Sequence, residues 1–276
     1  MVKPYSANEA QLAYIDEVTY GVTPTTPTMT IVTSAESVEP AIDPKLLQVR
    51  GIGSRGATFL VKGLRTVDLK FLYALQNITL LNHVISLASF SAEMLYAQTG
   101  SVISLLHKGV IPDKATVECA VEDFIKVTMD CIGQDLLPGT ASAGTSYTPV
   151  TTQPISFSDS YVKKAATAIE RVTSWKFMVE NNLKRVPVIR STSGNILKYL
   201  MERQINISGE MEFEFESKEE YDDVVGDTAF ALELGLGSSN KASISGCKWN
   251  KVSTPTKVSD LIALKAPFTA TGITIT

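Results

Sequence analysis

The stretch Glu210-Met211-Glu212-Phe213-Glu214-Phe215-Glu216 alternates acidic and apolar residues without a break. Successive side chains of a β-strand point to opposite faces, so this stretch predicts four carboxylates on one face and three apolar side chains on the other. Such alternation is typical of an antiparallel strand that has one face on a core and the other in water.

The same period of two recurs along most of the chain. Residues 66–73 place Val67, Leu69, Phe71 and Tyr73 on one face of a second strand. The alternating runs are rich in β-branched and aromatic residues, which fit a half-buried pleated surface. Further strands are predicted over residues 116–122, 124–132, 174–179, 229–236 and 262–276. The sequence therefore predicts an all-β fold.

Helical periodicity is confined to short segments. Residues 75–85 can wind with an apolar stripe along one side. Ser217 followed three residues later by Glu220 is the capping-box signature of a short acidic helix. A further short helix is expected within residues 1–14. Apart from this N-terminal segment, the sequence predicts one short helix in each half.

The middle of the chain, residues 138–149, is small, uncharged and rich in turn residues, which indicates a linker. The sequences on either side align at an offset of about 144 residues, with Phe71 on Phe215 and Asp68 on Glu212. At the far ends, residues 117–132 fall on residues 261–276.

A chance match of two β patterns is the alternative to a true repeat, but the element order agrees with the offset at several places. We therefore predict a duplicated fold. It consists of a first unit with an N-terminal arm over residues 1–137, the linker over residues 138–149, and a second unit over residues 150–276.

Composition narrows the classes of function. With 276 residues, 44% of them hydrophobic, the chain can bury a core, and its net charge is −4. A protein that wraps DNA from outside normally presents excess Lys and Arg, whereas a channel for DNA avoids strong attraction. The N-terminus has no apolar run of the signal-peptide type, and no segment approaches the roughly 20 apolar residues that cross a bilayer. We expect no membrane partner and assembly in the cytoplasm.

No group of residues predicts catalysis. The match to the dinucleotide fingerprint at Gly51-Ile52-Gly53-Ser54-Arg55-Gly56 is followed by a strand-like run, and Asp68 comes too early to be the ribose-binding acid. A flexible loop is the better interpretation. The acids at 210–216 predict a solvated face, since a catalytic pair needs one desolvated member.

The metal-binding and nucleophilic side chains are equally sparse. His83 and His107 are the two histidines and have no second ligand at metal spacing. Cys119, Cys131 and Cys247 show no CxxC spacing and are expected to be reduced thiols in the core. The sequence therefore predicts a non-enzymatic protein with no cofactor and no metal.

Four motifs, in this order, resemble those of phage tail tube proteins. Glu17-Val18-Thr19-Tyr20-Gly21-Val22-Thr23-Pro24 is similar to an E-x-x-Y-G-x-x-P opening. Residues 127–133 resemble a V-x-x-x-x-I-G strand end, and residues 174–183 a strand and turn that finish in N-N-L. Residues 209–215 resemble a G-x-x-x-x-x-F strand before an acidic helix. The resemblance extends from Glu17 to the C-terminus.

The resemblance implies a β-sandwich or barrel-like tube domain, shared with the tube protein of type VI secretion systems. Such domains assemble into rings with a β-barrel lumen, and the rings stack into a tail tube through which double-stranded DNA passes from capsid to host. The implied partners are further copies of the chain and other tail proteins, namely the tape measure, the tail terminator and the tail tip or baseplate. The implied location is the virion tail of a bacterial or archaeal virus.

In such a tube we expect Glu210, Glu212, Glu214, Glu216 and Asp68 to face the lumen, because an acidic wall keeps DNA mobile instead of binding it. The outer wall is the alternative location. The alternative function is a β-sandwich virion module that binds a receptor or carbohydrate. That module would present aromatic side chains in loops, but Trp175 and Trp249 fall in or beside predicted strands.

Overall fold

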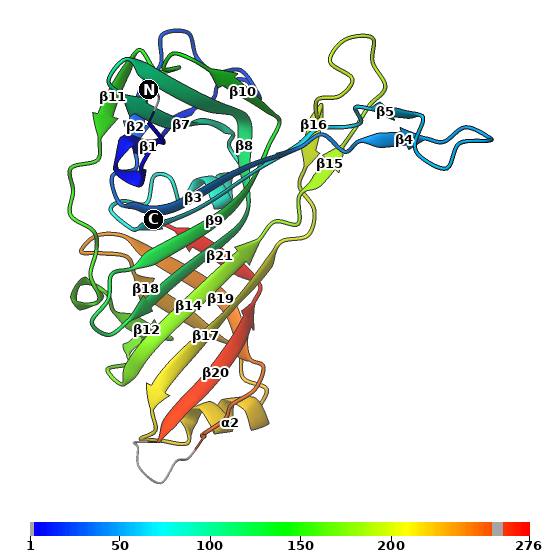
Figure 1. Cartoon of the computed structure of the whole chain (residues 1–276). Coiled ribbons are helices and arrows are strands. Elements are labelled where there is room, and N and C mark those ends of the chain that lie inside the picture. The colour runs from blue at the N-terminus through cyan, green and yellow to red at the C-terminus, as the bar shows by residue number, and fades with distance from the viewer. Residues whose placement is uncertain (1–2, 256–261) are drawn as a thin grey trace.

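Strands form nearly all the regular structure of the protein (Figure 1). The computed structural model describes residues 3–255 and 262–276. The alternating segments 66–73 and 174–179 lie within strands, and most of segments 124–132 and 229–236 does as well, which confirms the all-β prediction. The elements are 3-10 turn η1 (Ala7–Glu9), β1 (Ala10–Asp16), β2 (Thr28–Ile31), β3 (Ala35–Asp43), β4 (Leu47–Val49), β5 (Phe59–Val61), β6 (Thr66–Ala74), α1 (His83–Ser86), β7 (Phe90–Gln98), β8 (Ser101–Ala120), β9 (Lys126–Gly133), β10 (Asp135–Gly139), β11 (Ser146–Pro149), 3-10 turn η2 (Phe157–Asp159), β12 (Val162–Lys164), β13 (Thr167–Ala168), β14 (Val172–Glu180), β15 (Lys184–Val186), β16 (Tyr199–Met201), β17 (Asn206–Glu214), α2 (Glu219–Val225), β18 (Phe230–Gly235), β19 (Lys241–Trp249), β20 (Ala263–Ala270) and β21 (Gly272–Ile275).

Two of the helix predictions were wrong in extent. The described part of residues 1–14 forms turn η1 and strand β1, and residues 1 and 2 lie outside the described residues. Residues 75–85 form turns that end in the four-residue helix α1. The sheet competes for this backbone, since the Leu75 amide donates to the Ile125 carbonyl at 2.7 Å. The acidic helix α2 is present as predicted.

One long antiparallel sheet runs through the molecule in the order β3-β6-β9-β8-β14-β17-β20-β19. Its apolar face carries fully buried side chains from both halves of the chain, such as Phe71, Met129, Phe177 and Phe213. Its other face carries the polar residues of the alternating pattern. The sheet is therefore half-buried, as the sequence predicts.

A second layer of strands covers the apolar face in each half. In the first half β1, β7, the N-terminal part of β8, and β10 pair in order, with β2 and β11 beyond β1. In the second half β12, β18, β19 and β21 pair in order, with β13 beyond β12. Each half is thus two β layers packed over apolar side chains, such as Phe90 in the first half and Leu232 in the second.

The two halves pair their strands in the same order and register. Glu39 of β3 lies opposite Lys70 of β6, and at the equivalent place in the second half Lys176 of β14 lies opposite Glu210 of β17. Two offsets in residue number therefore relate the halves. We call the step from Glu39 to Lys176 the short offset, and the slightly larger step from Lys70 to Glu210 the long offset.

The covering layers follow the same two offsets. Phe90 of β7 pairs with Val110 of β8, and Phe230 of β18 pairs with Cys247 of β19. The long offset relates Phe90 to Phe230, and the short offset relates Val110 to Cys247. Both layers of the first half therefore have counterparts in the second.

Even the irregularities of pairing recur. The β-bulge between Ala35 and Ser37 has its counterpart between Val172 and Ser174, at the short offset. The bulge that follows Phe90 has its counterpart after Phe230, at the long offset. The predicted alignment of residues 117–132 with 261–276 was wrong, because the structural counterpart of β9 is β20, at the short offset.

Residues 138–149 lie against the first half and do not form an open linker. Pro138 and Gly139 complete β10, which pairs with β8. Strand β11 pairs in parallel with β2, and the Ala143 amide donates to Glu93 Oε1 at 2.8 Å. The chain crosses to the second half after β11, over residues 150–161.

Two β-hairpins project together from the body of the molecule (Figure 1). The β4–β5 hairpin is inserted between β3 and β6, and the β15–β16 hairpin between the equivalent strands β14 and β17. The Arg65 amide donates to the Asn195 carbonyl at 2.8 Å, so the base of the β4–β5 hairpin contacts the connection between β15 and β16. The glycine-rich segment 51–56 lies in the β4–β5 connection, and β5 follows it instead of a helix.

Substitution of Asn181 measures how much its hydrogen bonds stabilise the junction between the two halves. Its buried side chain follows β14 and donates to the carbonyls of Val84 (2.9 Å) and Pro112 (3.0 Å) in the first half. Asn181→Ala leaves two buried acceptors without these donors, and should lower the free energy of unfolding by about 1–3 kcal/mol. Urea denaturation measures this, with exposed Asn206→Ala as the control. Equal stability of the two variants would contradict this role.

Candidate functional site

The polar face of the long sheet is the surface on which most of the candidate acids lie. Glu210, Glu212 and Glu214 project from β17, and Met211 and Phe213 on its other face are completely buried. Asp68 lies on β6, on the same face of the same sheet but four strands away. The structure therefore places these four acids on one surface.

The predicted alternation ends earlier than expected. Strand β17 stops at Glu214, so Glu216 is not part of the acidic row. Phe215 is 41% exposed, and its ring meets the edge of Tyr221 at 6.5 Å. The prediction that Phe215 packs in the core was wrong, because the chain turns there toward α2.

Lysines from neighbouring strands lie among the acids. Lys176 Nζ is 4.0 Å from Glu210 Oε2, and Lys265 Nζ is 3.3 Å from Glu212 Oε1. Asp68 forms an ion pair with Arg185. These side chains are substantially exposed, so each pair adds little stability.

The acids of the face are Glu39, Asp43, Asp68, Glu118, Asp130, Glu180, Glu210, Glu212 and Glu214, and the lysines are Lys70, Lys114, Lys126, Lys176, Lys248 and Lys265. The surface is therefore mixed in charge with an acidic excess.

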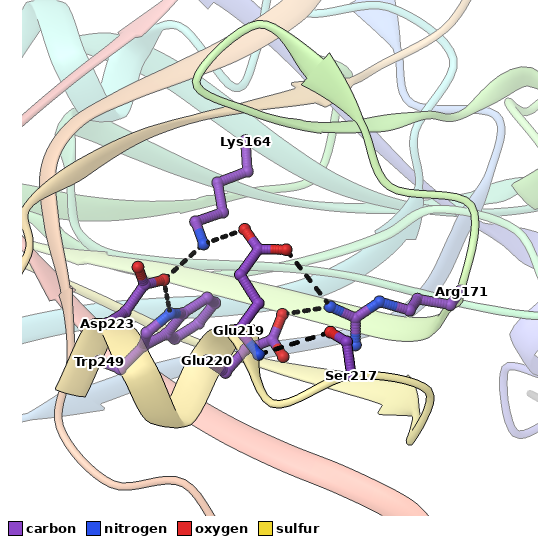
Figure 2. A network of polar contacts seen from close by, with 7 residues as sticks. All are labelled: Lys164, Arg171, Ser217, Glu219, Glu220, Asp223 and Trp249. Atoms are coloured by element: carbon purple, nitrogen blue, oxygen red, sulfur yellow. Dashed lines mark hydrogen bonds and ion pairs between the residues drawn. The ribbon is translucent and has the colours of Figure 1, made fainter. Parts of the chain in front are cut away.

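A second group of charges lies under helix α2 (Figure 2). Arg171 Nη2 is 2.5 Å from Glu220 Oε1, and the Glu220 side chain is completely buried. Lys164 contacts Glu219 at 2.6 Å and also Asp223, whose Oδ2 accepts a hydrogen bond from Trp249 Nε1 at 3.2 Å. The group ties α2 to β12, β19 and the start of β14.

The capping-box prediction at this helix was wrong. Lys218 occupies the N-cap position, and no side chain caps the helix there. The Glu219 amide lies 3.5 Å from Ser217 Oγ, and Glu220 turns inward to Arg171 instead of back to the N-cap. Arg171 is distant in sequence, so the local pattern contains no signal for this contact.

The pKa shifts of Lys164 and Glu219 indicate that these charges hold helix α2 in place. Burial lowers the pKa of Lys164, but its hydrogen bonds to Asp223 and Glu219 outweigh burial, so the pKa is raised overall. The hydrogen bond from Lys164 lowers the pKa of Glu219. Both residues therefore remain charged near neutral pH, and each is engaged by a partner within the protein.

Glu17, the first residue of the E-x-x-Y-G-x-x-P motif, organises a turn. Its carboxylate accepts hydrogen bonds from the Gly21 and Gly109 amides, both at 2.8 Å, and from the hydroxyls of Ser89 and Ser91. Gly21 has a φ of +75°, a backbone conformation that residues other than glycine rarely adopt. The motif therefore holds the segment after β1 against β7 and β8.

Glu93 is a buried acid that no sequence motif marks. Its carboxylate accepts hydrogen bonds from the Ala143 amide at 2.8 Å, from Ser104 Oγ and from Tyr147 Oη. These contacts hold the segment before β11 against the first half.

The histidines and cysteines are part of the packing. Burial lowers the pKa of His107 to about 4, so its ring is neutral at pH 7. His83 Nε2 lies 3.1 Å from Asp16 Oδ1. All three cysteines are free and buried, as expected, and burial raises the pKa of Cys119 to about 11. Within residues 3–255 and 262–276 no group of three potential metal ligands occurs, and no helix is long and apolar enough to cross a membrane.

Comparisons with known proteins place this architecture in a family. A family model described as phage tail tube protein matches residues 7–272. Among solved structures, one similar chain comes from the cryo-EM structure of the anti-feeding prophage baseplate, 6-fold symmetrised. The match has 10% identity and a TM-score of 0.38, and covers 52% of this chain and 99% of the other. No curated protein matches the sequence.

The buried pair of Arg171 and Glu220 can be tested by truncation. Glu220→Ala leaves the Arg171 guanidinium buried, with Glu219 at 4.0 Å as its remaining acidic partner among the described residues, so stability should fall by about 3–5 kcal/mol. Asp222→Ala on the same helix removes an exposed pair with Lys218 and should change stability by less than about 1 kcal/mol. Chemical denaturation measures both. Similar losses in the two variants would show that the buried pair has no special role.

Proposed function

Because the chain belongs to the phage tail tube protein family, we propose that its copies form stacked rings of the tail tube, through which double-stranded DNA passes from capsid to host. The coarser assignment follows from the family: the protein is a structural component of the virion tail. The ring and the passage of DNA are finer proposals, which the geometry of the sheet supports.

The observation that carries this proposal is the edge-to-edge junction of two equivalent halves. Strand β8 of the first half pairs with β14 of the second over seven residue pairs, from Ala120 opposite Ser174 to Lys114 opposite Glu180. The junction joins two different edges, so it is heterologous. Repetition of a heterologous contact produces a closed ring or an open filament, and a ring leaves no strand edge exposed.

We assign the two halves to two positions in that ring, with the first unit running to about residue 149 and the second from about residue 150. This assignment gives residues 138–149, which the sequence predicts to be a linker, to the first unit, because β10 and β11 pair with strands of that unit. A ring of six such units then contains three chains.

We assign the polar face of the long sheet to the lumen. The apolar face is covered by the second layer, so the polar face is the side of the sheet free to line a channel. Its acidic excess supports passage of DNA, since a basic wall would bind the phosphates through counterion release. The lysines beside Glu210 and Glu212 moderate the repulsion, which is screened within a Debye length of about 8 Å.

The proposed partners follow from this role. Copies of the chain contact one another within and between rings, and the ends of the tube meet other tail proteins such as the tape measure, the tail terminator and the tail tip or baseplate. DNA is a transient and non-specific partner. The alternative of a carbohydrate-binding module loses support because Trp175 and Trp249 are buried in the core, where they cannot stack on a sugar.

The stoichiometry of the ring is a direct test. Native mass spectrometry of purified rings should give three chains, and electron microscopy should show six similar densities around a channel. Six chains in one ring would contradict the assignment of two positions to each chain. Dispersed monomers at all concentrations would contradict the tube itself.

Charge reversal on β17 tests the lumen assignment. In Glu212→Lys/Glu214→Lys virions, tubes should form normally but DNA ejection should slow at least about tenfold, because basic side chains hold the phosphates. Glu212→Gln/Glu214→Gln removes the acids without adding positive charge and is the matched control. An unchanged ejection rate in the lysine variant, or a reconstruction with β17 acids on the outer wall, would contradict the lumen assignment.

A further inference from the structure

The junction between the two halves contains a cross-strand ion pair. Lys114 of β8 lies directly opposite Glu180 of β14, and Lys114 Nζ is 3.0 Å from Glu180 Oε1. One step along, Ala115 lies opposite Val179, and both side chains are completely buried. This intramolecular junction is a template for any contact between equivalent edges.

In the part of the chain that the structure describes, no further strand pairs with the equivalent edges at the two ends of the sheet. Strand β3 is the counterpart of β14, and among the described residues it pairs with β6 alone. The counterpart of the C-terminal part of β8 is the end of β19 and the residues that follow it. Ser253 pairs with Lys265 of β20, and Thr116 pairs with Thr128 of β9. The short offset relates Thr116 to Ser253 and Thr128 to Lys265, so the two pairs are equivalent.

The same correspondence places Lys251 at the position of Lys114 and Asp43 at the position of Glu180. Both ends of the ion pair in the internal junction are therefore reproduced, with the same signs, on the two open edges. Asp43 contacts the exposed Lys45 at 2.8 Å within this chain, and Lys251 is exposed. The neighbouring position is also matched, since Ile42 and Val252 are the counterparts of the buried Val179 and Ala115.

Ile42 is 45% exposed, whereas its counterpart Val179 is completely buried. That difference is what a missing neighbouring strand would produce. Helix α2 contacts β19, and its counterpart α1 contacts β8, which nevertheless pairs with β14. A helix packed against this strand is therefore compatible with a neighbouring strand.

We propose that residues 251–253 of one chain pair antiparallel with β3 of a second copy, in the register that places Lys251 opposite Asp43, Val252 opposite Ile42 and Ser253 opposite Ala41. The pairing rests on the proposed ring and specifies its contact between chains. The acidic edge of β3, with Glu36, Glu39 and Asp43, meets an edge that carries Lys251. Like edges repel, which favours the heterologous contact over β3 pairing with β3.

Charge exchange tests the pairing. Lys251→Glu places two acids opposite each other, and should weaken ring formation at least about tenfold in sedimentation or native mass spectrometry. Asp43→Lys should do the same, and Lys251→Glu/Asp43→Lys should restore rings. Lys248→Glu is the matched control, because Lys248 contacts Asp227 of its own chain at 2.8 Å; this variant should assemble like wild type. Thermal melts of the variants separate weak assembly from misfolding.

Cysteine pairs test the register independently. Residues directly opposite in an antiparallel pair have Cβ atoms about 4.5–5.5 Å apart, which approaches disulfide geometry. Ala41→Cys/Ser253→Cys should form crosslinks between chains on mild oxidation, whereas Glu39→Cys/Ser253→Cys, two positions out of register, should crosslink far less. If rings form without the expected crosslink, and if neither charge reversal weakens ring formation, the proposed pairing is wrong but the proposed tube is not contradicted. Absence of rings in the wild-type protein would overturn the tube.

Discussion

The pairing of β8 with β14 is the contact on which the rest of the architecture depends. Strand β8, with 20 residues, contributes its N-terminal part to the second layer of the first half and its C-terminal part to the long sheet. Its last residues then accept β14, so the hydrogen bonds of one strand connect both layers of the first half with the second half. Asn181 closes the same junction with side-chain hydrogen bonds to Val84 and Pro112. Without this junction the molecule would be two small sandwiches joined by a crossing segment.

The repeat in the structure has a simple physical basis. Strand pairing is set by register, and a slip of one residue exchanges the core and solvent faces. Between the halves, register is preserved at each compared ladder, and length changes fall in connections. The connection from Asp43 to Thr66 is shorter than the one from Glu180 to Asn206, because it holds a shorter projecting hairpin, and this difference turns the short offset into the long one. The β7–β8 hairpin is longer than the β18–β19 hairpin by the same amount, which restores the short offset.

These compensating changes in loop length explain why the sequence predicts the equivalence of some strands correctly and of others incorrectly. The offset predicted from the sequence differs from the long offset, which relates β6 to β17, by an even number of positions, so Asp68 and its partner Glu212 were placed on the correct face. The short offset relates β9 to β20, and here the alignment placed Val127 on Thr271, in a turn, instead of on the buried Leu264. Strands were predictable because alternation is local. The ion pair of Arg171 with Glu220 and the hydrogen bonds of Glu93 were not, because their partners are brought together only by the fold.

The covalent connection of two units also changes the energetics of the proposed ring. Half of the unit–unit junctions in a ring of three chains are made within chains, where folding has already aligned the two edges. Each separate chain that joins the ring also loses translational and rotational freedom, which costs several kcal/mol. Three chains bear that cost in two association steps, whereas six single-unit chains would bear it in five. The contact between chains can therefore use a short, charged edge with Pro40 in it, which has no N–H to donate, and still close. Such an edge is also a poor template for uncontrolled pairing. A weak edge is thus compatible with assembly here because the stronger junction is internal.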